Sequence, residues 1–86
     1  MATNNVTVGA TPTTVVVENP KRIILALVND SDEAIYLSLG GQAAMNMGIR
    51  LNASGGSLVL SGFTRHRGPV SAICASGTKI LCIEEL

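Results

Sequence analysis

Short apolar runs separated by turn-forming residues recur along the whole chain. The most pronounced lies in residues 21–39, where KRIILALV is followed by the polar cluster NDSDE and then by AIYLSL. The first run is apolar on both faces of a strand, which is typical of a strand buried on both sides in the middle of a sheet. Asn and Asp favour turns because their side chains bond their own backbone. We therefore predict two strands joined by a tight polar loop, forming a central hairpin.

The same kind of pattern predicts strands elsewhere in the chain, either from β-branched residues or from alternation of apolar and polar positions. The last two of these strands are expected to form a second hairpin that turns at Ser76 and Gly77. Residues 40–47 (GGQAAMNM) are the least strand-like, and either a helical turn or a loop crossing between sheets fits them. The further strands are predicted over residues 13–18, 48–52, 57–61, 69–75 and 78–84.

Together these segments give seven or eight short antiparallel strands with turn signals between them. Such spacing predicts an all-β fold, either a small β-sandwich or a jelly-roll-like barrel. A chain of 86 residues is expected to form one domain, residues 1–86. Residues 1–10 are polar and rich in Thr and Asn, and they fit either a flexible arm or an edge strand.

Composition adds an expectation about assembly. Hydrophobic residues make up 47% of the chain and charged residues 14%. A domain of this size buries only about 60% of the surface that its unfolded chain exposes. The surplus of apolar residues therefore indicates either strands buried on both faces or a surface covered by another subunit, and we expect a homo-oligomer. The candidate interface residues are Ile23, Leu25, Leu27, Met45, Met47, Phe63, Arg65 and Arg67.

The charge balance limits the classes of partner. Six basic and six acidic residues give a net charge of zero, which argues against nucleic-acid and membrane-surface binding because both depend on accumulated Lys and Arg. The first residues, MATNNVTVGA, lack the basic and apolar regions of a signal peptide. We therefore expect a protein made in a cytoplasm. Cys74 and Cys82 are expected to be free thiols, since the predicted strand register does not bring them together.

The sequence offers few residues that could catalyse a reaction or hold a cofactor. His66 is the single histidine, and no GxSxG motif is present. Asp30, Asp32 and Glu33 lack the glycine and the spacing of a calcium loop, so we interpret them as turn residues. The basic stretch around His66 is interpreted as a solvated loop or a subunit salt bridge. We predict a protein that is not an enzyme and that has no cofactor and no metal.

Several segments resemble a family of small bacteriophage virion structural proteins. They are VGATPTTVVVENP near the start, LALVNDSDEAIYLSLGG, a segment from Ile49 to Gly56 of the form I-x-L-x-x-x-G-G, RGPVSAICASGT, and the closing strand ILCIEE. The resemblance covers about residues 8–84. It implies a β-sandwich component of the virion, of the head decoration or auxiliary type, and it transfers no catalytic residue.

From the resemblance and the composition together we predict a viral structural protein located in the virion. It would be made in the host cytoplasm and would assemble as an oligomer on or in a bacteriophage particle, most naturally as a capsid decoration protein that stabilises the head. Its partners would be other copies of the chain and virion proteins such as the major capsid protein. The alternative is a tail, neck or fibre-associated binding module that recognises a host surface or another virion protein.

Overall fold

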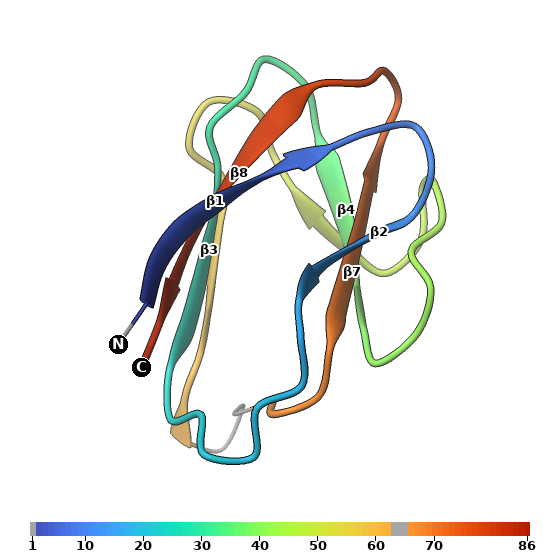
Figure 1. Cartoon of the computed structure of the whole chain (residues 1–86). Coiled ribbons are helices and arrows are strands. Elements are labelled where there is room, and N and C mark those ends of the chain that lie inside the picture. The colour runs from blue at the N-terminus through green and yellow to red at the C-terminus, as the bar shows by residue number, and fades with distance from the viewer. Residues whose placement is uncertain (1, 63–65) are drawn as a thin grey trace.

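The computed structural model describes residues 2–62 and 66–86, and it has the predicted all-β fold. Within these residues, eight strands form two antiparallel four-stranded sheets that pack together (Figure 1). Sheet A has the order β1-β8-β3-β6, and sheet B has the order β2-β7-β4-β5. The strands are β1 (Ala2–Val8), β2 (Thr13–Val16), β3 (Leu25–Asn29), β4 (Ile35–Leu39), β5 (Ile49–Leu51), β6 (Ser57–Leu60), β7 (Val70–Cys74) and β8 (Lys79–Glu85).

The two strand orders together are those of a jelly roll, which confirms the predicted fold class. Successive strands lie in different sheets at every connection except the one from β4 to β5. Residues 2–8 are an edge strand of sheet A, paired along their whole length with β8. In the described part of the chain, no helix has the length and apolar character needed to cross a membrane.

Both predicted hairpins are wrong. The strand β3 lies in sheet A between β8 and β6, whereas β4 lies in sheet B between β7 and β5. Likewise β7 belongs to sheet B and β8 to sheet A. A polar turn between two apolar strands looks the same in sequence whether the chain folds back within one sheet or crosses to the other. The central position predicted for the first strand is confirmed, because β3 has a neighbour on each side.

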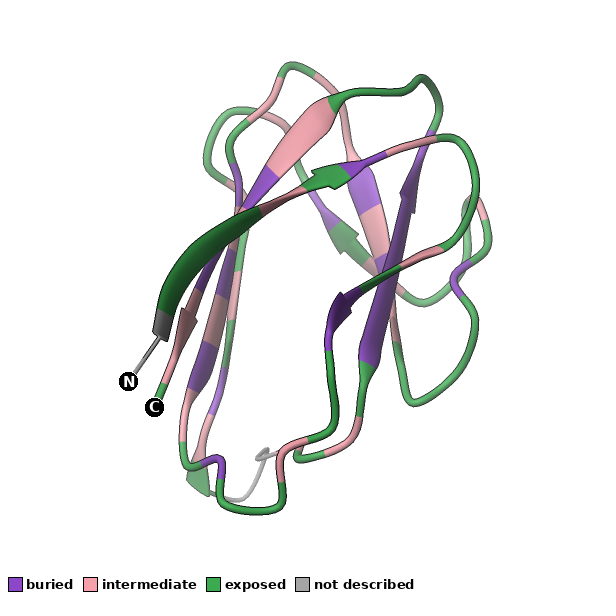
Figure 2. Cartoon of the chain, viewed as in Figure 1, coloured by how far each residue is buried: buried purple, intermediate pink, exposed green. Residues whose placement is uncertain are grey.

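The inner faces of the two sheets supply the core, as the purple segments of the strands in Figure 2 show. Alternate residues of β3 and β4 point inward, and Leu25, Leu27, Ile35 and Leu37 have no solvent exposure. This corrects the sequence prediction for Leu25 and Leu27. They were expected at a subunit interface, but the second sheet of the same chain covers them.

The outer face of sheet B is covered by the connection between β4 and β5. There Ala43 is buried and its backbone N–H donates to Ser71 Oγ of β7 at 3.1 Å. The hydroxyl of Tyr36 on β4 donates to Asn46 Oδ1 at 3.1 Å. This cover explains why all five residues of β7 are buried. Residues 40–47 are therefore neither a helical turn nor a crossing between sheets, because they return the chain to sheet B.

Truncation of an inward-facing side chain tests the two-sheet core. Leu27→Ala is expected to lower the free energy of unfolding by about 2–5 kcal/mol, because it removes buried methyl groups and leaves a cavity. Val17→Ala, at a side chain that is 73% exposed on the connection between β2 and β3, is the matched control and is expected to change it by less than about 0.5 kcal/mol. Urea denaturation measures both. Equal effects of the two substitutions would contradict the assignment of Leu27 to the core.

Candidate interaction surface

A buried arginine closes one end of the sandwich. The Arg22 side chain is 1% exposed, and its Nε donates to Glu85 Oε2 of β8 at 2.6 Å. Its two terminal nitrogens donate to three backbone carbonyls, those of Val17 at 2.6 Å, His66 at 2.8 Å and Gly68 at 3.1 Å. The guanidinium thus bonds the β2–β3 connection, the β6–β7 connection and the last strand at once. Charge-assisted bonds of this kind compensate the cost of burying a cation.

Neighbouring groups extend this cluster. Arg67 Nε donates to the Arg22 carbonyl at 3.1 Å, and the backbone N–H of Asn19 donates to the Arg67 carbonyl at 2.8 Å. The hydrogen bond from Arg22 holds the pKa of the Glu85 carboxyl below its ordinary value, against the opposing effect of burial. Arg67, predicted to lie at an interface, therefore has a bonding role inside its own chain.

A buried asparagine closes the other end. Asn29 is fully buried at the end of β3, and its Nδ2 donates to the carbonyls of Glu33 at 2.8 Å and Leu51 at 3.0 Å. Its Oδ1 accepts from Ser31 Oγ at 2.6 Å, and its backbone N–H donates to the Gly56 carbonyl at 2.8 Å. The β3–β4 and β5–β6 connections are therefore tied together around one side chain. A Cβ at Gly56 would lie 2.3 Å from the Asn52 carbonyl oxygen, so this packing requires glycine.

The acidic residues Asp32 and Glu33, close to Asn29 in sequence, bond residues in and next to the β7–β8 connection. Glu33 accepts from the backbone N–H of Ser76 at 2.8 Å and from its hydroxyl at 2.9 Å, and these bonds lower the pKa of Glu33. Asp32 accepts from Lys79 Nζ at 2.6 Å, which lowers the pKa of Asp32. In the part of the chain that the structure describes, no group of three His, Cys, Asp or Glu is placed to hold a metal ion.

Neither cysteine is in a disulfide, in agreement with the sequence prediction. Cys74 is buried, and its thiol donates to the Ser76 carbonyl at 2.6 Å. Burial raises the pKa of Cys74, and the nearby Glu33 carboxylate raises it further. A thiol held in its protonated form is a poor nucleophile, so this geometry does not activate Cys74. Cys82 is half-buried on the outer face of sheet A, where its side chain points away from the core.

The outer face of sheet A is exposed, in contrast to that of sheet B. The strand register defines two rows of side chains that cross all four strands of this face. Aliphatic side chains lie on β3 and at Val59 of β6, whereas the β1 residues and Glu84 of β8 are polar. Val59 on β6 is 57% exposed. One row runs Asn5, Cys82, Val28 and Ser57, and the other runs Thr3, Glu84, Ala26 and Val59.

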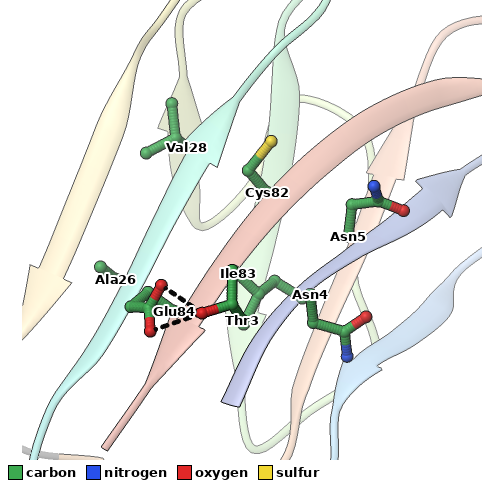
Figure 3. A pocket seen from close by; sticks show the side chains of 8 residues that line it. All are labelled: Thr3, Asn4, Asn5, Ala26, Val28, Cys82, Ile83 and Glu84. Atoms are coloured by element: carbon green, nitrogen blue, oxygen red, sulfur yellow. Dashed lines mark hydrogen bonds between the residues drawn. The ribbon is translucent and has the colours of Figure 1, made fainter. Parts of the chain in front are cut away.

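Part of this face is hollowed. An open depression of about 630 Å³ lies over β1, β8 and β3 (Figure 3). At one side of it the Thr3 hydroxyl donates to both carboxylate oxygens of Glu84, at 2.9 and 2.8 Å. Among the described residues, no aromatic side chain lines it. We define the outer face of sheet A as the open face. The residues that line its depression are Thr3, Asn4, Asn5, Ala26, Val28, Cys82, Ile83 and Glu84.

The sequence-predicted interface residues do not gather at this surface. Ile23 is 57% exposed just before β3, where its backbone N–H donates to the Leu86 carbonyl at 2.7 Å. Met47 is 68% exposed in the β4–β5 connection, and Met45 is half-buried there. Phe63 and Arg65 lie outside the described residues.

Sequence reasoning missed both the Arg22 cluster and the open face. A signal for the first was present in β8, where Glu85 continues the inward alternation of Leu81 and Ile83. An acid on the core face of a strand requires a basic or hydrogen-bonding partner. The open face could not be predicted because its residues come from four strands, and the sequence does not reveal how these strands pair.

Comparison of the chain with protein-family models, with curated proteins and with solved structures found no match.

The Arg22–Glu85 pair predicts a dependence of stability on pH. Because the folded-state pKa of Glu85 is lowered from 4.5, its stabilising effect is complete above that value and is lost as the pH falls through the folded-state pKa. Glu85→Gln is expected to cost about 2 kcal/mol of unfolding free energy at pH 7 and progressively less towards pH 3. Glu84→Gln, on the open face of the same strand, is the control. Urea titrations that show a pH-independent cost for Glu85→Gln would contradict the role of the carboxylate.

Proposed function

We propose that this chain is a non-enzymatic structural protein that assembles with copies of itself and with other proteins through the open face. The observation that carries the proposal is the unequal covering of the two sheets. Sheet B has its own loop over its outer face, anchored by Ala43 and Asn46, whereas sheet A leaves aliphatic side chains such as Val59 exposed. Apolar surface of this kind on a small protein marks an interaction site.

The arrangement of residues on the open face supports a protein partner. Its aliphatic side chains on β3 and β6 lie beside Thr, Asn, Ser and Glu side chains, and protein–protein interfaces combine apolar and hydrogen-bonding groups in this way. Glu84 is the charged side chain of the two rows, and it accepts hydrogen bonds from Thr3. Sugars commonly stack on aromatic side chains, and no aromatic side chain of the described residues lines the depression. A protein surface therefore fits this face better than a glycan does.

We propose further that the assembly is a bacteriophage particle, with the chain as a decoration protein that stabilises the head. The support is the sequence resemblance over residues 8–84, joined by the jelly-roll topology, which occurs in viral capsid domains and also in lectins. Fold alone does not assign a function. Binding at many lattice sites would raise the stability of the particle by mass action.

Substitution on the open face tests the assembly proposal. Val59→Lys is expected to raise the dissociation constant of the assembly at least about tenfold, because it replaces a buried contact by a charge. Val17→Lys is the matched control, since Val17 is 73% exposed on the β2–β3 connection away from this face. Sedimentation equilibrium measures both variants. The same dissociation constant for Val59→Lys and the native chain would contradict the role of the open face.

The location in a virion is tested on particles from the strain that carries the gene. Quantitative mass spectrometry of gradient-purified virions is expected to find the chain in a fixed ratio of copies to the major capsid protein, as lattice binding requires. A few copies per particle would instead support the tail, neck or fibre alternative. Absence of the chain from purified particles would overturn the virion proposal and leave the open-face proposal to be judged by the Val59 variant.

A further inference from the structure

Strand β1 is the least protected edge of the two sheets. The edge strands β2, β5 and β6 are three or four residues long. In addition, β2 has an irregular register between Thr14 and Val16, and β5 presents Arg50. Short length, bulges and charged residues are the usual devices that prevent an edge from pairing with another chain.

None of these devices is present in β1. It is seven residues long, ATNNVTV, with no charged residue and no proline. Its pairing with β8 is regular at all seven positions, from Ala2 opposite Glu85 to Val8 opposite Lys79. In the described part of the chain β1 pairs with β8 alone, so its other side offers a regular row of backbone N–H and C=O groups. Figure 1 shows this strand along the edge of its sheet.

We infer that a second copy of this chain pairs with β1 through its own β1, antiparallel and about a two-fold axis at Asn5. The two sheets A would then join into one continuous sheet. This inference rests on the proposed self-assembly and names one contact that makes it. Because a two-fold contact uses the same strand on both copies, it closes at a dimer and does not propagate into a filament.

The sequence of β1 fits this pairing. Asn5 is the central residue of the strand, so a register that places Asn5 opposite itself pairs the strand over its full length. Thr3 then lies opposite Thr7 of the second copy on the exposed side, and Asn4 lies opposite Val6 on the core side. Thr–Thr pairs across neighbouring strands form hydrogen bonds and stabilise a sheet. With no charged side chain in β1, the two-fold axis brings no like charges together.

The pairing would also extend the open face. Thr3 and Asn5 line the depression at its β1 side. Joining two copies at β1 therefore places the two depressions on one side of one continuous sheet, separated by the paired strands. A larger partner would meet a surface twice as wide as the one that a single copy presents.

Disulfide trapping tests the register. The variant Asn5→Cys is made in a Cys82→Ser background, because Cys82 lies opposite position 5 on β8 and would compete within the chain. Opposed residues of antiparallel strands have Cα atoms about 4.5–5.5 Å apart, which suits a disulfide. Under mild oxidation this variant is expected to form covalent dimers at least about tenfold faster than Thr14→Cys in the same background, a control on the β2 edge. Equal rates would overturn the inference.

A charge at the axis gives an independent measurement. Asn5→Lys places two like charges opposite each other and is expected to raise the dimer dissociation constant roughly fivefold, whereas Thr14→Lys leaves it unchanged. Association that responds to Val59→Lys but not to Asn5→Lys, with no trapping at position 5, would overturn the β1 contact and leave the open-face proposal standing. A native chain that stays monomeric would overturn both the β1 contact and self-assembly through the open face.

Discussion

The backbone that crosses between the sheets must be hydrogen-bonded at both ends of the sandwich, and this constraint shapes the rest of the structure. Buried carbonyls without partners would cost about as much free energy as the lost hydrogen bonds. Arg22 supplies donors to three such carbonyls at one end, and Asn29 supplies donors to two at the other. With the ends closed by these side chains, apolar residues fill the core between the two sheets.

The covering of each sheet face determines where the apolar residues lie. Inward positions of both sheets take Leu, Ile and Val, and the loop that carries Ala43 shields the outer face of sheet B. Of the exposed apolar residues, Val59 lies on the open face, whereas Val17, Ile23 and Met47 lie elsewhere. Part of the apolar surplus in the sequence therefore lies on the open face, through which we propose that the chain assembles.

The fold class was predictable from sequence because alternation and turn residues are local properties. Strand pairing was not, since the polar stretch after β3 has the same composition whether it forms a hairpin or a crossing. The partner of Glu85 also lies 63 residues away, so Arg22 gave no local sign of its role. Leu25 and Leu27 were misplaced for the same reason, because their covering sheet comes from strands distant in sequence. The exposure of Ile23 and Met47 could be anticipated, but their separation from the open face could not.

The mass of the native chain in solution tests the central claim, that the chain assembles with copies of itself, most directly. Sedimentation velocity over a wide range of concentration is expected to show species that are multiples of the 8.9 kDa monomer, growing with concentration. The oligomers should be favoured by mass action alone, with no added ligand. A single 8.9 kDa species at every concentration, with no binding to virion proteins, would contradict the account.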